Sequence, residues 1–222
     1  MSKALVIIPT YNELENIPIV LERVIELPIT FDVLFVDDNS PDGTAELVKN
    51  YIKKNDTRVF LESKNKKEGL GKAYTHGFSW ALSKNYDYIF EMDADLSHDP
   101  LDLVKMYKEL ESSNCDVVVG SRYINGINVV NWPLSRIILS YLASIYSRVI
   151  TGLPVKDATS GFVGFKRKVL EKMNLKSILF NGYAFQIELK FKAFKNNFRI
   201  LEIPIIFKDR IHGESKMNGD II

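Results

Sequence analysis

Short apolar runs alternate with amphipathic stretches along the first 120 residues of the chain. We expect buried strands where the runs are continuous and rich in β-branched residues, over residues 4–8, 31–36, 59–61, 86–92 and 116–120. Between these runs, apolar residues recur at helical spacing, as they do at Ile17, Val20, Leu21 and Val24. This alternation predicts an α/β fold, with a doubly wound, mostly parallel, Rossmann-like sheet and helices on both faces.

The second half of the chain has a less regular pattern. A loop rich in Gly and Asn over residues 124–131 precedes an expected helix over residues 132–151, which Gly152 and Pro154 close. The remaining pattern predicts a loop from Asp157 into a short strand, a helix over residues 183–195, a strand over residues 199–207 and a basic tail. No stretch has the composition of a linker, so we expect a single domain over residues 1–222.

Composition and charge argue against several classes of protein. Of 222 residues, 46% are apolar and 26% are charged, which is ordinary for a globular domain that buries a full core. A net charge of +1 argues against a nucleic-acid partner, and the single cysteine, Cys115, favours a reducing compartment. No signal peptide is expected, because residues 1–3 lead straight into a strand. The uncharged run over residues 137–147 is well short of the roughly 20 residues that span a bilayer.

Two carboxylates, Asp93 and Asp95, follow the apolar run over residues 86–92. Ligands collect at the carboxyl ends of the strands in a parallel sheet, so both acids are expected where chemistry is done. Side chains two residues apart on an extended segment project the same way, about 6–7 Å apart, close enough to share one hard cation. The pair is therefore a candidate site for a metal that carries a diphosphate. The alternative is that both acids only cap a helix that begins near Asp99 and Pro100.

Further acids follow other expected strands, with Glu13 after the first and Asp37 and Asp38 after the second. At one edge of a parallel sheet they would line a crevice suited to a ribose or a base. The chain has neither a Gly-x-Gly-x-x-Gly pattern nor a Gly-x-x-x-x-Gly-Lys-Ser/Thr pattern for phosphate binding. Phosphates would therefore depend on a metal and on basic side chains. The candidates, each of which taken singly reads more simply as a surface charge, are Arg122, Arg136, Arg210 and Lys216.

Seven short motifs in this chain occur, in the same order, in inverting glycosyltransferases of the GT-A fold. They are Pro9-Thr10-Tyr11-Asn12-Glu13, Val36-Asp37-Asp38-Asn39-Ser40-Pro41-Asp42-Gly43-Thr44, Met92-Asp93-Ala94-Asp95-Leu96-Ser97-His98, Gly120-Ser121-Arg122-Tyr123, Asn131-Trp132-Pro133, Thr159-Ser160-Gly161-Phe162 and Arg210-Ile211-His212-Gly213-Glu214-Ser215-Lys216-Met217. The first three mark a wide superfamily, and the last four are more specific. On these motifs, which span nearly the whole chain, the sequence resembles the polyprenol (dolichol) monophosphate mannose synthases.

The resemblance implies a metal-dependent enzyme that moves mannose from GDP-mannose to a polyprenyl (dolichyl-type) monophosphate with inversion. The implied cofactor is Mg²⁺ or Mn²⁺. The resemblance also implies a nucleotide-sugar-binding half over residues 1–121 and an acceptor-binding half over residues 122–222. The enzyme would be cytoplasmic and peripheral on the inner face of a membrane.

The same resemblance implies roles for individual residues. The nucleotide sugar would be bound by Pro9, Tyr11, Glu13, Val36, Asp38, Asp93, Ala94, Asp95, Arg210 and Lys216. The metal would be bound by Asp93, Asp95 and Ser97, and the acceptor phosphate by Arg122, Arg136 and Ser140. The catalytic residues would be Asp93, Asp95 and Arg122. Because a polyprenyl phosphate is ionised at neutral pH, its oxygen nucleophile needs positioning rather than a general base.

Two departures from the family pattern affect these expectations. Some relatives have Gln, a metal ligand, where this chain has Ser97, so coordination at this position would run through water. Many relatives continue into hydrophobic membrane helices, whereas this chain stops at Ile222, so it would belong to a short soluble type or have lost a tail.

Other functions fit part of the same pattern. One is the same chemistry with another donor, such as UDP-glucose, and another is a non-catalytic nucleotide-binding module. The Asp-x-Asp pair and the basic tail argue against the second. A sugar-1-phosphate nucleotidyltransferase is disfavoured, because its Gly-rich N-terminal loop is missing.

Overall fold

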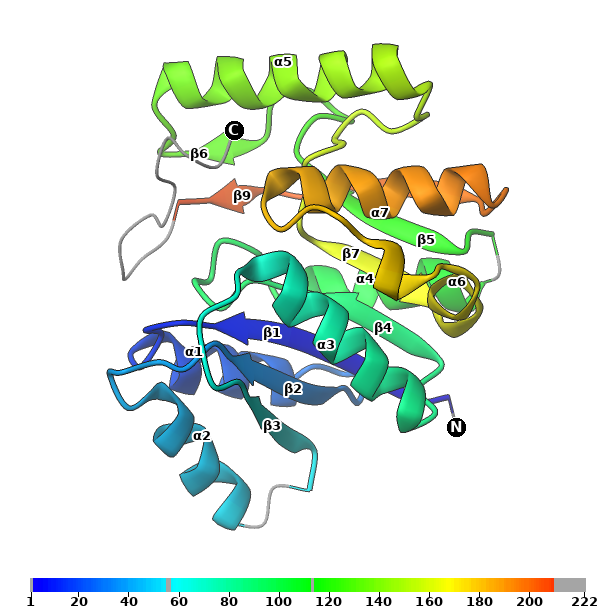
Figure 1. The fold of residues 1–222 in the computed structure, drawn as a ribbon. Helices are drawn as coiled ribbons and strands as arrows, with labels where there is room; N and C mark the ends of the chain where they lie inside the picture. The colour runs from blue at the N-terminus through cyan, green and yellow to red at the C-terminus, as the bar shows by residue number, and fades with distance from the viewer. Residues whose placement is uncertain (1, 55–56, 113, 210–222) are drawn as a thin grey trace.

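The computed structural model describes residues 2–54, 57–112 and 114–209, which form an α/β architecture around one central sheet (Figure 1). Seven strands join in the order β3-β2-β1-β4-β7-β5-β8. Their bounds are β1 Ala4–Thr10, β2 Asp32–Asp37, β3 Val59–Ser63, β4 Tyr88–Glu91, β5 Val117–Ser121, β7 Val163–Lys166 and β8 Ile200–Pro204. Neighbours pair in parallel, except that β7 is antiparallel to both β4 and β5. The predicted doubly wound, mostly parallel sheet is confirmed.

Helices cover both faces of this sheet (Figure 1). Helices α1 Asn16–Ile25, α2 Thr44–Lys53 and α4 Leu101–Glu111 pack on one face, and α3 Leu70–Ser83, α6 Arg167–Lys172 and α7 Tyr183–Lys195 pack on the other. Strand β1 shows how the apolar runs produce this arrangement, since Val6 and Ile8 belong to the first core and Leu5 and Ile7 to the second. Successive side chains of a strand point to opposite faces, so a continuous apolar run fills two cores at once.

Some local predictions are corrected. Helix α2 begins at Thr44, whose backbone N–H and hydroxyl donate to Asp42 Oδ1 at 3.0 and 2.6 Å. The expected strand over residues 199–207 divides into β8 and a short strand β9, Phe207–Lys208, which pairs with β6, Val129–Val130. Helix α6 and the 3₁₀ helix Leu175–Ser177 are not predicted by the pattern.

Strand β7 fits between β4 and β5 because it carries a glycine at the closest approach. A Cβ atom at Gly164 would lie 2.7 Å from Phe90 Cδ1 and 2.9 Å from Val118 Cγ1, on the strands to either side. A larger residue would force these core side chains out of their packed positions. The antiparallel strand matters for the site, because it brings the preceding loop, residues 157–162, to the edge where β4 ends.

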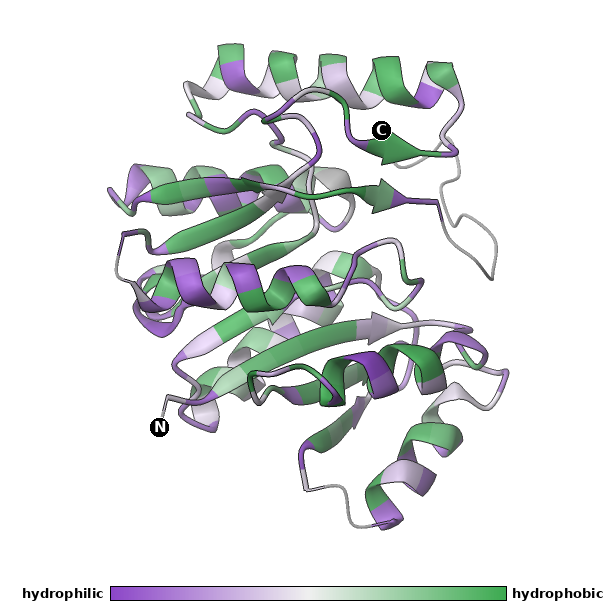
Figure 2. Ribbon diagram, turned by 180° about the vertical axis from the view of Figure 1, so that it is seen from behind, coloured by the Kyte–Doolittle hydropathy of each residue, from purple (hydrophilic) through white to green (hydrophobic). Residues whose placement is uncertain are grey.

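Helix α5, Leu134–Thr151, lies along the outside of the molecule with much of its apolar surface exposed (Figures 1 and 2). Its buried residues are Ser144 and Ser147, whereas Tyr146 and Val149 are 70% and 76% exposed. This reverses the usual amphipathic packing, in which the apolar stripe of a helix faces the core. Within the described residues, no helix is both long and apolar enough to cross a membrane.

Candidate functional site

The candidate site lies along the edge of the sheet where β1, β2 and β4 end (Figure 1). Thr10 and Asp37 end β1 and β2 in register, and the Thr10 hydroxyl donates to Asp37 Oδ1 at 3.0 Å. The Ser40 hydroxyl donates to the same oxygen at 2.6 Å. One buried carboxylate therefore ties the loops after β1 and β2 together, which fixes the segment that carries Tyr11 and Glu13.

Asp38 is only 6% exposed, and its side chain interacts with the loop after β3. Its Oδ1 pairs with Lys64 Nζ at 2.9 Å, and its Oδ2 accepts from the N–H groups of Glu68 and Gly69 at 3.1 and 2.9 Å. The carboxylate thus anchors the loop after β3. Sequence reasoning did not identify Lys64 as a partner of Asp38. In the sequence it stands out only as part of a short basic run.

The anchored loop reaches the expected nucleoside position. Lys67 Nζ lies 3.9 Å from the centroid of the Tyr11 ring, a cation–π contact. Pro9 and Val36 are paired in the register of β1 and β2. The Val36 side chain is fully buried in the core, so any contact from this residue to a ligand would come from its backbone.

Asp93 and Asp95 leave β4 through a strained turn. Leu96 adopts a φ of 62°, a left-handed conformation that costs a residue with a side chain roughly 1–2 kcal/mol. The turn is held from within, since Ser97 N–H donates to Asp95 Oδ1 at 3.1 Å and His98 Nδ1 accepts from Asp93 N–H at 3.3 Å. Burial lowers the pKa of His98 to about 4, so the ring is neutral and Nδ1 is available as an acceptor.

Oxygen atoms gather around this turn. Asp95 is 8% exposed, and Ser97 Oγ is buried with no hydrogen-bond partner among the described residues. The Tyr74 hydroxyl lies 3.5 Å from Asp93 Oδ1, and burial together with the neighbouring acids raises the pKa of Tyr74 well above its ordinary value. Such oxygen donors fit a hard cation such as Mg²⁺ or Mn²⁺. Within the described residues, no three or more His, Cys, Asp or Glu side chains are grouped so that they could hold a metal by themselves.

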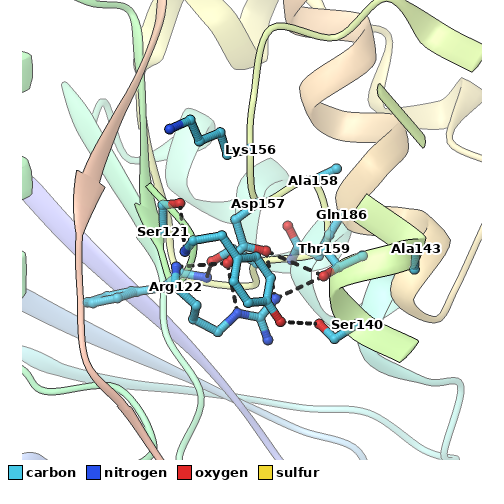
Figure 3. A network of polar contacts seen from close by, with 12 residues as sticks. Ser121, Arg122, Ser140, Ala143, Lys156, Asp157, Ala158, Thr159 and Gln186 are labelled. Atoms are coloured by element: carbon cyan, nitrogen blue, oxygen red, sulfur yellow. Dashed lines mark hydrogen bonds and ion pairs between the residues drawn. The ribbon is translucent and has the colours of Figure 1, made fainter. Parts of the chain in front are cut away.

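Arg122 is buried, and Asp157 holds its guanidinium at both ends (Figure 3). Arg122 Nε donates to Asp157 Oδ2 and Nη2 to Oδ1, both at 2.7 Å, and the Arg122 N–H donates to Oδ2 at 2.9 Å. Nη2 also donates to the Thr159 hydroxyl at 2.8 Å. Burial alone would raise the pKa of Asp157, but the charge and hydrogen bonds of Arg122 hold it below its ordinary value. Sequence reasoning missed Asp157, which lies 35 residues further along the chain.

Arg136 and Ser140 extend from α5 toward the same region as Arg122. The guanidinium carbon of Arg136 lies 3.9 Å from the centroid of the Trp132 ring, and that of Arg122 lies 5.3 Å from the same ring. Ser140 Oγ accepts from the hydroxyl of Tyr123, the neighbour of Arg122, at 2.8 Å. The structure therefore brings two of the three residues expected at the acceptor phosphate, Arg122 and Arg136, to the Trp132 ring, and the third, Ser140, to the neighbour of Arg122.

The last two basic residues expected to bind the donor, Arg210 and Lys216, follow Asp209 in the sequence. Arg136 Nη1 pairs with Asp209 Oδ1 at 3.2 Å, and Asp209 is the last described residue. Arg210 and Lys216, which are expected to contact the donor, lie outside the described residues. Their role stays a prediction.

Two buried ionisable side chains beneath the turn, Glu91 and Lys190, were also missed. Glu91 precedes Asp93 at the end of β4, and burial raises its pKa to about 8 against the opposing charge of Lys190. Lys190 lies on α7 and is fully buried as well. Each could have been noticed in the sequence as a charged residue among the apolar residues of a strand or helix. That pattern does not reveal which side chain it faces.

Comparison with known proteins agrees with these features. The sequence model of the family described as glycosyl transferase family 2 matches residues 5–173. The chain is 42% identical over 220 residues to polyprenol monophosphomannose synthase of Mycolicibacterium smegmatis, covering 99% of this chain and 83% of that protein. It is 40% identical over 220 residues to undecaprenyl-phosphate mannosyltransferase of Micrococcus luteus, covering 99% of this chain and 89% of that protein.

Solved structures share the fold at lower identity. A mannosyltransferase from Pyrobaculum calidifontis in complex with GDP-Man and Mn²⁺ superposes with a TM-score of 0.63 at 19% identity, over 96% of this chain and 58% of that chain. Glucosyl-3-phosphoglycerate synthase from Mycobacterium tuberculosis with Mn²⁺, UDP-Glc and phosphoglyceric acid superposes with a TM-score of 0.67 at 16% identity, over 99% of this chain and 74% of that chain.

The two relatives confirm the resemblance drawn from the motifs, and the solved structures confirm the GT-A fold. The family match covers more than half of the chain and includes the Asp-x-Asp turn, Arg122 and Asp157. This chain therefore belongs to glycosyl transferase family 2.

Proposed function

We propose that this enzyme transfers mannose from GDP-mannose to a polyprenyl monophosphate with inversion, giving polyprenyl β-mannosyl phosphate. The observation that carries the proposal is the identity of 42% and 40% to two relatives that are named for mannose transfer to a polyprenyl carrier. The aligned region is 220 residues long in each case, so it covers both the Asp-x-Asp turn and the region around Trp132. GDP as the donor nucleotide rests on the motif resemblance.

In this proposal, residues 1–121 bind the donor. The loops after β1 and β2 present Tyr11 and Glu13 to the nucleoside, and Asp38 fixes the loop whose Lys67 lies over the Tyr11 ring. A base that stacks on Tyr11 would replace the Lys67 ammonium as the partner of that ring face. Lys67 would then be free to turn toward the negative charge of the diphosphate.

Asp93 and Asp95, with Ser97 beside them, would hold the divalent metal. When bound, Mg²⁺ or Mn²⁺ would offset the charge of the leaving nucleoside diphosphate. The protein's own contribution is to keep two carboxylates oriented on a turn that His98 and Ser97 hold in place. The Tyr74 phenol beneath Asp93 limits the positions that this carboxylate can take.

Residues 122–222 would bind the acceptor around Trp132. Arg122 and Arg136 lie near the same indole ring, and two guanidiniums suit a phosphate dianion. Ser140 accepts from the Tyr123 hydroxyl, which leaves the hydrogen of its own hydroxyl for a phosphate oxygen. The phosphate oxygen is already ionised, so these residues orient a nucleophile rather than remove a proton from it.

We also infer that α5 rests on the membrane surface, on the cytoplasmic side. Its polar residues Arg136, Ser140 and Ser144 face the protein, and residues such as Tyr146 and Val149 face outward. An apolar surface of this kind beside the expected phosphate site would receive the isoprenoid chain where it leaves the bilayer. The acceptor would then reach Arg136 without leaving the interface.

A donor screen tests the proposed function. Purified protein is incubated with Mn²⁺, a short polyprenyl phosphate and either labelled GDP-mannose or labelled UDP-glucose. We expect a β-linked product from GDP-mannose and transfer from UDP-glucose lower by roughly 100-fold, because a site that hydrogen-bonds one base leaves polar groups unpaired with another. Equal or faster transfer from UDP-glucose would contradict the donor assignment, and binding without any transfer would favour a non-catalytic module.

Replacing Asp95 by Asn tests the metal site. The substitution keeps the shape of the side chain and removes its charge, so we expect Mn²⁺-dependent GDP affinity to fall roughly 10- to 150-fold by calorimetry. Asp99→Asn is the matched control, because Asp99 accepts from Leu101 N–H at the start of α4 and should affect only stability. Unchanged Mn²⁺-dependent affinity in Asp95→Asn would favour the capping alternative.

Replacing Arg136 by Ala tests the acceptor site. Loss of a charged hydrogen bond should lower kcat/KM for the polyprenyl phosphate roughly 10- to 150-fold and leave GDP-mannose affinity within about twofold. Arg148→Ala, an exposed residue on the last turn of α5, should leave both values unchanged. Parallel losses for donor and acceptor, or no loss at all, would place the acceptor phosphate elsewhere.

Replacing Val149 by Asp tests the membrane-facing surface of α5. Val149 is 76% exposed, so the change removes no core packing, and we expect binding to phosphatidylethanolamine and phosphatidylglycerol vesicles to fall roughly tenfold in a sedimentation assay. Leu101→Asp on α4 is the control, since Leu101 is also exposed, at 60%, and should not change vesicle binding. Equal binding by both variants and the unmodified protein would refute this orientation.

A further inference from the structure

A fully buried lysine on α7 holds the loop that precedes β7. Lys190 Nζ donates to the carbonyl oxygens of Ser160, Gln186 and Ala158, at 2.7, 3.1 and 3.2 Å. Two of these carbonyls belong to the loop and one belongs to the preceding turn of α7 itself. Burying an ammonium is costly unless its hydrogens are bonded, so this lysine fixes the loop relative to the helix.

A glutamate on β8 holds the same loop from another element. Glu202 Oε2 accepts from Lys156 N–H at 2.7 Å, and Oε1 accepts from Asp157 N–H at 2.9 Å. The carboxylate thus takes both backbone donors at the start of the loop, and Lys190 takes backbone acceptors further along it. The two tethers come from elements that follow the loop in the chain.

The tethered loop determines where the guanidinium of Arg122 lies (Figure 3). Asp157 accepts from Nε and Nη2 of Arg122, both at 2.7 Å, and Thr159 accepts from Nη2 at 2.8 Å. A forked pair of this kind fixes the plane of the guanidinium as well as its position. A shift of the loop would therefore move Arg122 with it.

We propose that Lys190 and Glu202 are positioning residues for the acceptor phosphate, because they fix the loop whose Asp157 orients Arg122. The proposal rests on the proposed function, in which Arg122 contacts that phosphate. Neither residue touches a substrate in this arrangement. Their effect is geometric, and a displacement of about 1 Å in a reacting group can lower a rate roughly 100-fold.

The test compares Lys190→Met and Glu202→Gln with the unmodified enzyme. We expect Lys190→Met to lower kcat/KM for a short polyprenyl phosphate by about 10- to 100-fold, with GDP-mannose affinity changed less than about twofold. Glu202→Gln keeps one acceptor oxygen and loses the other, so it should give a smaller loss in the same direction. If Lys190→Met does not fold, Glu202→Gln alone decides the outcome.

Lys192→Met is the matched control. Lys192 is on the same helix, but its Nζ donates to Ser177 Oγ at 2.7 Å and to the Ser177 carbonyl at 2.9 Å, away from the loop. It should change melting temperature without changing acceptor kinetics. Equal acceptor losses in Lys190→Met and Lys192→Met would overturn the proposal in favour of a general loss of structure.

A double-mutant cycle identifies the route of the effect. If Lys190 acts through Asp157, adding Lys190→Met to Asp157→Asn should cost less than about twofold more, because the oriented pair is already broken. Independent, multiplied losses would overturn the proposal. So would equal loss of donor and acceptor function in Lys190→Met.

A measurement that needs no activity separates this proposal from the proposed function. The backbone N–H of Arg122 donates to Asp157 Oδ2, so its hydrogen exchange reports the position of the loop. We expect exchange at least about tenfold faster in Lys190→Met, with the amides of β1 unchanged. Absence of mannose transfer by the unmodified protein would refute the proposed function but not the positioning of the loop. Unchanged exchange at the Arg122 amide in Lys190→Met would refute the positioning of the loop, whatever the activity.

Discussion

The buried ion pair between Arg122 and Asp157 fixes two segments of the candidate site to each other. Arg122 directly follows β5, and Asp157 begins the loop that leads into β7, so one pair connects segments 35 residues apart. Breaking a buried pair costs about 3–5 kcal/mol, because the remaining charge has no partner. An apolar pair of similar size would often be as stable, so stability alone does not explain these two charges. The fixed position of the Arg122 guanidinium, 5.3 Å from the centroid of the Trp132 ring, explains them better.

The position of this pair depends on the antiparallel strand. β7 enters the sheet between β4 and β5, and Gly164 makes that insertion sterically feasible. Phe162, just before β7, stacks on His98 with ring centroids 4.6 Å apart, and His98 in turn accepts from the N–H of Asp93. One continuous set of contacts therefore runs from the loop that holds Arg122 to the Asp-x-Asp turn. The proposed donor and acceptor regions are therefore parts of one packed unit rather than two separate sites.

Periodicity was sufficient for much of the fold. The apolar runs predicted β1, β2, β4 and β5, because a strand buried on both faces leaves a continuous run of apolar residues. Asp93 and Asp95 could be placed at an edge of the sheet for the same reason. The direction of β7 could not be predicted, since local sequence does not specify which strands pair across long separations.

Side-chain partnerships were the part that sequence reasoning could not reach. Taken singly, Arg122 reads as a surface charge, but the structure buries it against Asp157. Nothing in the sequence indicates that Lys64 pairs with Asp38. The burial of Lys190 depends on backbone carbonyls that carry no sequence signature. The pattern predicted the helix that becomes α5, but periodicity does not say which face of a helix is covered.

The central claim is that donor diphosphate and acceptor phosphate bind at opposite ends of this connected set of residues. A crystal structure of the unmodified protein with Mn²⁺, GDP and a short polyprenyl phosphate tests it most directly. We expect an anomalous manganese peak at the carboxylates of Asp93 and Asp95. We expect the lipid phosphate within hydrogen-bonding distance of Arg122 and Arg136. Manganese bound elsewhere, or a lipid phosphate remote from both guanidiniums, would contradict the account.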